Sequence, residues 1–367
     1  MSPDHSAERF ALYHDIDRFN ASRALACPVS PTARELRKRS VFRLCKSGRT
    51  TLATTNQRLL YDPKFSCAII LESLSRIQVD VITGGWWGET LRWRQNPGLS
   101  NRDWRVFDID HCGNIETIRF YDIDGCGIPE VFPNTPNGPT CCYKLVTDAS
   151  GRGTGAFQKI LLNAEPSGHG LGFGDISGNG RTDVILNHGW LEHPGQNAWS
   201  KPWVMHPEFS LGQASVPILA YDVNHDGRTD LIVGQAHDYG LSWIEQGNDA
   251  DGQRHWIWHS IDPSGSQFHD LQLVDLDNDG QLELVTGKRY RAHNDGDPGA
   301  DDPIGIYYYK MFGGTFEKHV IDYGSAGEAS GTGIYFWVQD VTGNGYPDLV
   351  APGKDGLYLF ENLGMRA

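Results

Sequence analysis

Hydrophobic and polar residues alternate in short runs along most of the chain, and each run ends in a turn-forming stretch. The segments "ILAYD" and "LQLVD" are typical of this pattern. A period of two places successive side chains on opposite faces of a strand. The pattern therefore predicts many short strands. One short helix is predicted near residues 30–40, where Ser30 or Thr32 would cap it.

A nine-residue loop rich in glycine and acidic residues recurs between these strands. Five copies begin at Asp122, Asp175, Asp222, Asp275 and Asp340, and a sixth, beginning at Glu72, has lost its glycines. One apolar strand leads into each loop and three more follow, so that the whole unit repeats roughly every 50 residues, as in the blades of a β-propeller.

The repeat predicts an all-β fold, a single β-propeller of four-stranded blades over residues 1–367. Residues 68–363 contain six recognisable blades, and the last of them stops at its third strand. Residues 10–17 match the fourth-strand pattern, so we expect this N-terminal strand to pair in the C-terminal blade and close the ring. Residues 18–67 form either a degenerate extra blade or an insertion, and seven blades are favoured over six.

Composition and charge narrow the possible partners. The chain has 43 Gly and 19 Pro, which suits a fold with frequent chain reversals, and its formal net charge is −14. This acidity argues against binding to nucleic acid. No apolar run is long enough to cross a membrane, and the N-terminus lacks the apolar core of a secretory signal. Seven cysteines without a framework spacing fit reduced thiols, so a cytoplasmic location is expected.

Two of the loops carry oxygen donors at positions one, three, five and nine, a spacing that suits calcium. The ligands expected in these two loops are Asp222, Asn224, Asp226 and Asp230 in one, and Asp275, Asp277, Asp279 and Glu283 in the other. The remaining loops are expected to be weak sites or metal-free turns. A turn without calcium is the alternative for the two better loops also, and in either case the loops are structural.

A second group of polar residues lies at the other end of the blades. Antiparallel pairing brings the start of each first strand close to the end of the second strand, opposite the loop. Counting back six residues from the loop gives Glu116, His169 and His269; counting past the second strand gives Trp86, Trp87, His188, His237, Lys288 and Arg289. First strands line the central axis of a propeller, so these side chains are expected to meet at one mouth of the ring.

Histidines and a carboxylate at equivalent positions predict either a divalent metal site or a pair of acid and base groups. His169, His269 and Glu116 would form this centre, and His237 or His188 would carry a further proton. Lys288 and Arg289 would stabilise a developing oxyanion. The substrate would contact Trp86, Trp87, Tyr239, Asp238 and Trp190, although most of the 11 Trp are expected to pack between strands.

With these residues in view, the chain resembles the FG-GAP/VCBS repeat propellers over roughly residues 68–363. The segments "HGLGFGDISGNGRTDVIL" and "GQAHDYGLSWIEQ" resemble the propeller domain of fungal aldos-2-ulose dehydratase. Other similar proteins are the stand-alone fungal hetero-Diels-Alderases of tropolonic sesquiterpene pathways and a GlcNAc-binding propeller lectin of mushrooms. The chain lacks the cupin domains of the first group and several intact calcium loops of the lectin.

The resemblance implies a lyase-type enzyme of small-molecule metabolism, of the fungal secondary kind, that promotes loss of water from an oxygenated substrate. The product would be released or guided through a quinone methide into an intermolecular hetero-Diels-Alder cycloaddition. The alternatives are a carbohydrate-binding lectin without catalysis and a metal-dependent sugar dehydratase. Lectin pockets would repeat in every blade, whereas His169 and His269 recur in only two. The expected partner is a small molecule, and the oligomeric state is left open.

Overall fold

The computed structural model describes residues 42–45, 67–73, 78–97, 103–196, 198–290, 292–353 and 356–364. These residues form strands β1 to β24 and one short 3₁₀ turn, η3 (Ala292–Asp295). The predicted helix near residues 30–40 lies outside the described residues. Within the described part of the chain, no helix has the length and apolar character needed to cross a bilayer. The prediction of an all-β chain is confirmed for this part.

The strands form four sheets of four strands and one sheet of eight, which together make six four-stranded units. Unit 1 contains β2 (Cys67–Ser73), β3 (Gln78–Gly84), β4 (Thr90–Gln95) and β5 (Arg105–His111). Unit 2 contains β6 (Thr117–Tyr121), β7 (Glu130–Asn134), β8 (Pro139–Thr147) and β9 (Gly153–Pro166). Unit 3 contains β10 (Leu171–Gly174), β11 (Asp183–Leu186), β12 (Gly189–Glu192) and β13 (Val204–His206).

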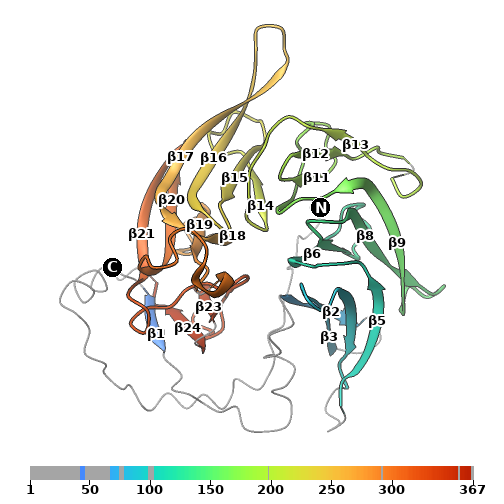
Figure 1. Cartoon of the computed structure of the whole chain (residues 1–367), viewed down its shortest axis with the longest axis horizontal. Coiled ribbons are helices and arrows are strands. Elements are labelled where there is room, and N and C mark those ends of the chain that lie inside the picture. The colour runs from blue at the N-terminus through green and yellow to red at the C-terminus, as the bar shows by residue number, and fades with distance from the viewer. Residues whose placement is uncertain are drawn as a thin grey trace, which may run out of the picture.

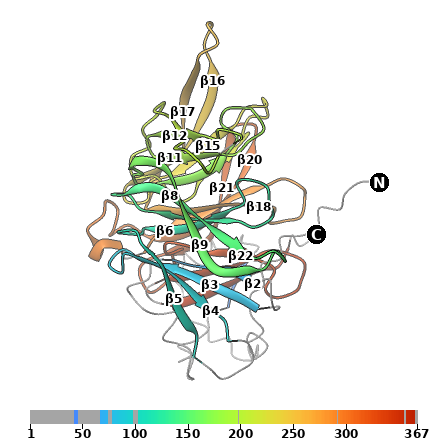
Figure 2. The ribbon, with the colours of Figure 1, turned by 90° about the vertical axis from the view of Figure 1, so that its right-hand side faces the viewer.

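Unit 4 contains β14 (Ile218–Tyr221), β15 (Asp230–Gly234), β16 (Tyr239–Asn248) and β17 (Arg254–Ser266). Unit 5 contains β18 (Phe268–Val274), β19 (Glu283–Lys288), β20 (Ile304–Phe312) and β21 (Thr315–Gly324). Unit 6 contains β22 (Trp337–Gln339), β23 (Asp348–Gly353) and β24 (Gly356–Asn362), joined by β1 (Phe42–Cys45). The units follow one another around a common centre (Figure 1), and the hairpin of β16 and β17 projects beyond the rest (Figure 2).

The strand that completes unit 6 differs from the one expected. Strand β1 pairs antiparallel with β24, with Phe42 opposite Asn362 and Cys45 opposite Leu359. It comes from the segment that was expected to form an extra blade or an insertion, and residues 10–17 lie outside the described residues. The pattern of a fourth strand is short and therefore weakly specific, and the pairing with β24 assigns this position to β1.

Units 3 and 4 share one sheet because their first strands approach unusually closely. Gly172 of β10 pairs in parallel with Ile218 of β14. A Cβ atom at Gly172 would lie 2.2 Å from the carbonyl oxygen of Ile218, so a larger residue cannot be accommodated there without a shift of the backbone. This close approach draws the starts of the two first strands together near the centre.

The glycine-rich loops are stabilised by their own acidic residues. In the fourth unit, the backbone N–H groups of Asp226 and Gly227 donate to the carboxylate of Asp222 at 3.0 and 2.9 Å. The last acid of the loop, Asp230, accepts the backbone N–H of Val223 at 3.1 Å and that of Gln246 at 2.8 Å. Corresponding bonds from Leu276 to Glu283 and from Ile176 to Asp183 show that the ninth position ties each loop to the sheet.

Aromatic stacking between third and fourth strands recurs in several units. Trp190 stacks on His206 with ring centroids 4.1 Å apart, and Trp243 stacks on His259 at 4.2 Å. Trp190 is almost fully buried in a core cluster between units 3 and 4. The prediction that Trp190 contacts substrate is therefore wrong for this conformation, because its ring is enclosed by the packing between sheets.

A buried ion pair ties distant units together. Arg119 on β6 of unit 2 donates to Asp270 Oδ1 on β18 of unit 5 at 2.7 Å, and also to the carbonyl oxygen of Val216. Asp270 also accepts the backbone N–H of Phe336, just before unit 6, at 3.0 Å. Asp270 is fully buried, so its charge depends on these partners. The pair links units 2, 4, 5 and 6.

Candidate functional site

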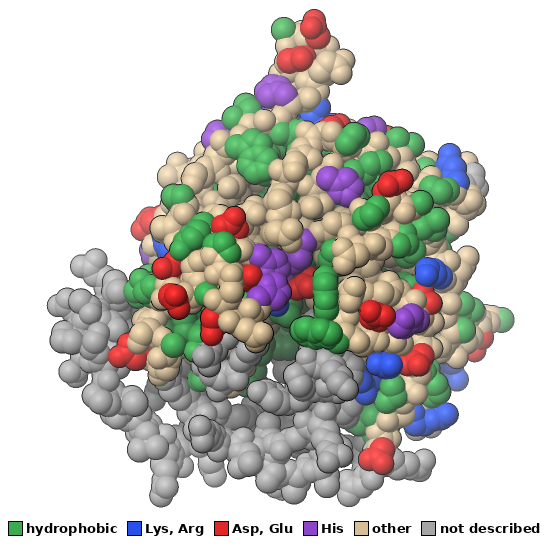
Figure 3. Space-filling model, viewed as in Figure 1, with side chains coloured by type: hydrophobic (Ala, Val, Ile, Leu, Met, Phe, Trp, Pro, Cys, Tyr) green, Lys and Arg blue, Asp and Glu red, His purple; other side chains and the backbone are tan. Residues whose placement is uncertain are grey.

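Four side chains that are far apart in the sequence meet at one end of the units. They are Glu116, His169, His237 and His269, and one ligand-type atom from each lies within 4.8 Å of all the others. Glu116 and His169 come just before the first strands of units 2 and 3, His269 lies on the first strand of unit 5, and His237 follows the second strand of unit 4. In the space-filling view, histidine side chains gather near the middle of this face (Figure 3).

The contacts inside this histidine cluster are short. His237 Nε2 lies 3.0 Å from His169 Nε2, and His269 Nε2 lies 3.0 Å from Glu116 Oε1. His169 Nε2 is 3.8 Å from the same oxygen of Glu116. His269 is fully buried, and His169 and Glu116 are each 6% exposed. The cluster is therefore largely shielded from water.

The outer nitrogens of two histidines determine which way their lone pairs point. His169 Nδ1 lies 2.7 Å from the carbonyl oxygen of Ala214, and His237 Nδ1 lies 3.1 Å from Asp297 Oδ2. A carbonyl and a carboxylate oxygen only accept hydrogen bonds, so both Nδ1 atoms carry the proton. In neutral imidazoles the two Nε2 atoms then present lone pairs to each other across 3.0 Å. Such a pair is repulsive unless a cation or a proton lies between them.

Burial keeps the imidazoles of His237 and His269 neutral near pH 7. Burial and the neighbouring His169 lower the pKa of His237 to about 4, although Asp297 opposes the shift. Burial and the charge of Arg289 lower the pKa of His269 to about 3, against the effect of Glu116. Neutral imidazole is the form that binds metal ions.

Glu116 remains ionised inside the cluster. Burial alone would raise its pKa, but the hydrogen bond from His269 and the charge of Arg289 hold the pKa of Glu116 well below its usual range. The Arg289 guanidinium lies 3.5 Å from Glu116 Oε1. The site thus combines three imidazoles, one carboxylate and one arginine, as the sequence pattern had suggested for Glu116, His169, His269 and Arg289.

Lys288 has a different environment from the one expected. Its ammonium donates to the carbonyl oxygens of Ala300 at 3.4 Å and Asp302 at 2.7 Å, and also to that of Gly299, and the side chain is buried. These carbonyl oxygens accept the hydrogen bonds of the ammonium, and the bonds fix the connection between β19 and β20 in place. Lys288 therefore does not point to the position where an oxyanion would develop, and that expectation is corrected.

The other predicted residues lie outside the four-residue cluster. His188 Nδ1 donates to Asn187 Oδ1 at 2.7 Å, and burial lowers the pKa of His188. The Tyr239 hydroxyl donates to Asp302 Oδ2 at 2.6 Å, and the carbonyl of Asp238 accepts the backbone N–H of Gln267. Trp87 is 77% exposed, and the carbonyl of Trp86 accepts a hydrogen bond from Asn114. These groups line the same end of the units without entering the cluster.

Sequence reasoning missed Asp297. It lies in a stretch with several Asp and Gly residues that reads as a solvated loop, yet its side chain is only 10% exposed and contacts His237. The one local signal was His293, four residues earlier, whose Nδ1 lies 2.8 Å from Asp297 Oδ1. This spacing is too common in loops to be informative without the fold.

In two of the glycine-rich loops a lysine ammonium contacts the loop carboxylates. Lys310 Nζ lies 2.6 Å from Asp277 Oδ2 and 3.9 Å from both Asp279 and Glu283. In unit 2, Lys144 occupies the equivalent position and contacts Asp124 and, at 3.0 Å, Glu130. The Asp275 loop was expected to be as good a calcium site as the Asp222 loop. The Lys310 ammonium offsets part of the negative charge of this loop, and the carboxylates of Asp275, Asp277 and Asp279 still lie within 4.8 Å of one another.

The Asp222 loop has a carboxylate at the corresponding position. Asn224 Nδ2 donates to Glu245 Oε1 at 3.1 Å and to Asp226 at 3.2 Å. Arg228 also contacts Asp226 from the loop itself. Asp230, expected as a ligand, uses both oxygens on backbone N–H groups, as described above. Asp222 likewise accepts backbone N–H groups on both oxygens, so a cation in this loop would share carboxylates that already have hydrogen-bond partners.

We expect Lys310→Met to create a calcium response in the Asp275 loop. Removal of the ammonium leaves Asp275, Asp277 and Asp279 close together, because their carboxylates lie within 4.8 Å of one another. Saturating calcium, at about 100 times its dissociation constant, would then add about 2.7 kcal/mol to the free energy of unfolding. Chemical denaturation with calcium and with magnesium measures this gain. Lys201→Met, at an exposed lysine, is the control, and an equal calcium effect in the wild type and Lys310→Met would contradict the prediction.

Glu283 makes a pH-dependent contribution to stability. Burial, followed by the charge of Asp277, raises its pKa from 4.5 to about 7. A raised pKa in the folded state means that stability is fully present below pH 4.5 and falls as the pH rises towards 7. Relative to Glu283→Gln, the wild type should lose up to about 3 kcal/mol over this range. Denaturation at several pH values measures the loss, and parallel curves for the two proteins would contradict it.

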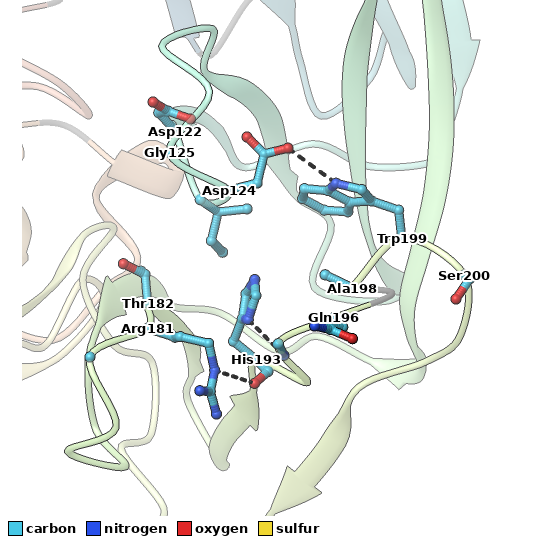
Figure 4. Close-up of a pocket in the computed structure, with 13 residues that line it drawn as sticks. Asp122, Asp124, Gly125, Arg181, Thr182, His193, Gln196, Ala198, Trp199 and Ser200 are labelled. Atoms are coloured by element: carbon cyan, nitrogen blue, oxygen red, sulfur yellow. Dashed lines mark hydrogen bonds between the residues drawn. The ribbon is translucent and has the colours of Figure 1, made fainter.

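A separate cavity of about 800 Å³ lies at the loop end of units 2 and 3 (Figure 4). Its polar groups are paired with one another: Trp199 Nε1 donates to Asp124 at 3.1 Å, and Arg181 Nε donates to the carbonyl of His193 at 3.2 Å. Asp122 and Glu116 lie at opposite ends of β6, so this cavity is at the other end of the units from the histidine cluster. The cluster, with its facing nitrogens, is the stronger candidate for chemistry.

Comparisons with known proteins support the assignment of an FG-GAP-like repeat and do not identify a function. Residues 222–286 match the FG-GAP-like repeat. Comparison with curated proteins gave no match. Among solved structures, the chain is similar to the biofilm matrix protein Bap1 of V. cholerae, with 15% identity and a TM-score of 0.36 over 75% of this chain. It spans 41% of the length of that Bap1 chain.

A second similar structure is BBS1N in complex with ARL6DN, with 12% identity and a TM-score of 0.42. That comparison covers 81% of this chain and 78% of the other. Both likenesses are too distant to carry functional information. The described residues form an all-β, propeller-like fold, and the match over residues 222–286 shows that the chain contains FG-GAP-like repeats.

Proposed function

We propose that the chain is a lyase-type enzyme that removes water from an oxygenated small molecule at the histidine cluster. A divalent metal ion would be held by Glu116, His169, His237 and His269. The observation that carries the proposal is the pair of Nε2 atoms 3.0 Å apart, each with its Nδ1 proton committed to another acceptor. A bound metal ion would accept both lone pairs from His169 and His237 and so remove their repulsion.

The donor set suits such an ion. Three imidazoles and one carboxylate are common ligands of zinc and of other divalent transition metals. The two shortest separations in the cluster, both 3.0 Å, match ligands that share one ion at about 2.0–2.1 Å. The Nδ1 hydrogen bonds of His169 and His237 are the outer contacts that metal-binding histidines usually make.

The charges around the cluster favour an anionic oxygen of the substrate. Glu116 and Asp297 contribute one negative charge each and Arg289 one positive charge, so a divalent ion would make the site cationic overall. The ion would act as a Lewis acid on a carbonyl or hydroxyl oxygen. Arg289 would orient the same oxygen by hydrogen bonding, and its location beside Glu116 holds it in place.

Proton transfer requires a neutral imidazole outside the ligand set. His188 fits this role, because it follows β11 at the same end of the units and burial keeps it neutral. Tyr239, Trp86 and Trp87 would border the bound substrate. An α-hydroxy or β-hydroxy carbonyl compound is the expected substrate class, since loss of water from it needs both proton removal and stabilisation of an enolic oxygen.

The resemblance to the fungal enzymes adds a further step to the proposal. If the dehydrated product is a quinone methide, the same mouth would hold it beside an alkene, and positioning alone lowers the entropic barrier of the cycloaddition. We further infer a ring of blades closed by β1 in unit 6, a cytoplasmic enzyme, and a structural calcium ion at the Asp222 loop. The cytoplasmic location and the calcium ion are carried over from the sequence expectations, whereas closure by β1 takes the place of the expected closure by residues 10–17.

The test combines metal analysis with an assay for dehydration. Purified wild-type protein and the pair His169→Ala and His269→Ala are analysed for transition metals and calcium, with circular dichroism as the check on folding. A panel of hydroxy-carbonyl compounds is screened for the absorbance of the unsaturated product. We expect a transition metal that is lost in the variants together with dehydration. Unchanged metal content in the folded variants would overturn the proposal.

A further inference from the structure

The connection between β19 and β20 lies against the histidine cluster of the neighbouring unit. Its residues 292–303 belong to unit 5, whereas His237 belongs to unit 4. The Lys288 ammonium donates to three carbonyl oxygens of this segment, and Tyr239 of unit 4 donates to Asp302 at 2.6 Å. Gln267 Nε2 donates to the carbonyl of Pro298 at 3.3 Å. The segment is therefore anchored at several points to both units.

Asp297 is the residue through which this segment reaches the cluster. Its Oδ2 accepts from His237 Nδ1 at 3.1 Å, and its Oδ1 lies 2.8 Å from His293 Nδ1. The His293 ring also stacks on the His237 ring, with centroids 4.6 Å apart and planes at 16°. Both oxygens of Asp297 are thus used on histidines, and His237 is held from its edge and from its face.

The backbone of the segment is strained next to these contacts. His293, Asn294 and Asp295 have φ values of 46°, 55° and 63°, all in the left-handed region that disfavours residues with a Cβ atom. Three consecutive residues in this region persist only where the surrounding contacts outweigh the cost. The turn brings His293 and Asp297 to the same face of the segment, where both meet His237.

We propose that Asp297 is a positioning residue of the histidine cluster. By accepting the Nδ1 proton of His237, it selects the tautomer whose Nε2 lone pair faces His169, and His293 holds the carboxylate in the required orientation. His269 differs, because its Nδ1 has no hydrogen-bond partner. Asp297 is therefore the charged outer contact of the set. This inference rests on the proposed metal-binding function and deepens it.

The first measurement needs no metal. In metal-free protein labelled with ¹⁵N-histidine, long-range proton–nitrogen correlation spectra report which ring nitrogen of His237 is protonated, with His237→Gln used to assign the signal. We expect the Nδ1–H tautomer in the wild type. We expect Asp297→Ala to lose this preference, and Asp297→Asn, which keeps an acceptor oxygen, to retain it.

The second measurement is the affinity for Zn²⁺ and the visible spectrum of the Co²⁺-substituted protein. Loss of an outer contact to a ligating histidine weakens metal binding by about 10–100-fold, so we expect this change in Asp297→Ala and a smaller one in Asp297→Asn. Asp301→Ala is the matched control. Asp301 is exposed in the same segment, and its substitution removes the same charge. It should bind Zn²⁺ as the wild type does.

The outcomes separate the two proposals. Equal Zn²⁺ affinity of the wild type and Asp297→Ala, or an unchanged tautomer of His237 in Asp297→Ala, overturns the positioning role while leaving the metal site intact. A wild type that binds neither Zn²⁺ nor Co²⁺, but whose His237 tautomer depends on Asp297, overturns the proposed function and leaves the positioning of His237 by Asp297 supported.

Discussion

Arg119→Met is expected to lower the free energy of unfolding by about 3–5 kcal/mol, because it leaves the buried carboxylate of Asp270 without its charged partner. Asp270 is fully buried and 2.7 Å from the Arg119 guanidinium. Even with the arginine present, burial raises the pKa of Asp270 to about 6. Removal of Arg119 also abolishes the hydrogen bonds that link unit 2 to units 4 and 5. The loss is measured by urea denaturation at pH 8, where Asp270 is ionised in the wild type.

The matched control is Arg92→Met. Arg92 pairs with Asp108 at the same distance, 2.7 Å, but the Asp108 side chain is 67% exposed. Exposed ion pairs contribute at most about 1 kcal/mol, so this variant should remain within that range of the wild type. Equal losses in the two variants would show that the Arg119 pair does not have the special role inferred from its burial.

Glu116→Gln is expected to weaken binding of a divalent metal ion by more than about 100-fold, since it removes a charged ligand instead of an outer contact, whose loss alone costs about 10–100-fold. It also leaves the Arg289 guanidinium, 3.5 Å away, without its counter-charge. The positive charge near the metal position would then oppose binding further. Isothermal titration with Zn²⁺ and Mn²⁺ measures the affinity, and dehydration activity should fall in parallel.

Glu165→Gln provides the control for this second variant, because Glu165 is exposed on β9 and has no contact with the cluster. Circular dichroism and denaturation curves check that Glu116→Gln is folded. A folded Glu116→Gln protein that binds metal as tightly as the wild type would contradict the assignment of Glu116 as a ligand. In that case the carboxylate would serve only to hold His269 and Arg289 in place.

The convergence of the cluster could be predicted from the sequence because it follows from strand direction alone. Glu116, His169 and His269 occupy the same position relative to their loops, so any fold that repeats the unit around an axis brings them to one end. His237 follows from the antiparallel pairing of the second strand. These inferences need only period-two strands and recurring loops, both of which are local properties of the chain.

Other assignments failed because they depended on which partner a side chain meets. Lys288 was expected beside the substrate, but its ammonium is enclosed by carbonyls of the segment that follows it. Lys310 lies on a third strand with no local sign that its ammonium would contact Asp277, 33 residues earlier in the Asp275 loop. Asp297 was read as part of a solvated loop. For Lys310 and Asp297 the partner comes from a distant part of the chain, and for Lys288 it comes from a connection whose path no local pattern specifies.

The amino-acid sequence by itself determined the repeating unit, the all-β class and the end of the units where the polar residues collect, because strand period, turn residues and strand direction are set by neighbouring residues. The tertiary structure decided which imidazole nitrogen faces inward and which lysine contacts the carboxylates of the Asp275 loop. It also decided which segment completes the last unit and which aspartate supports His237. Those choices depend on contacts between units, where a shift of one or two ångströms determines whether a hydrogen bond forms, and no local pattern specifies such distances.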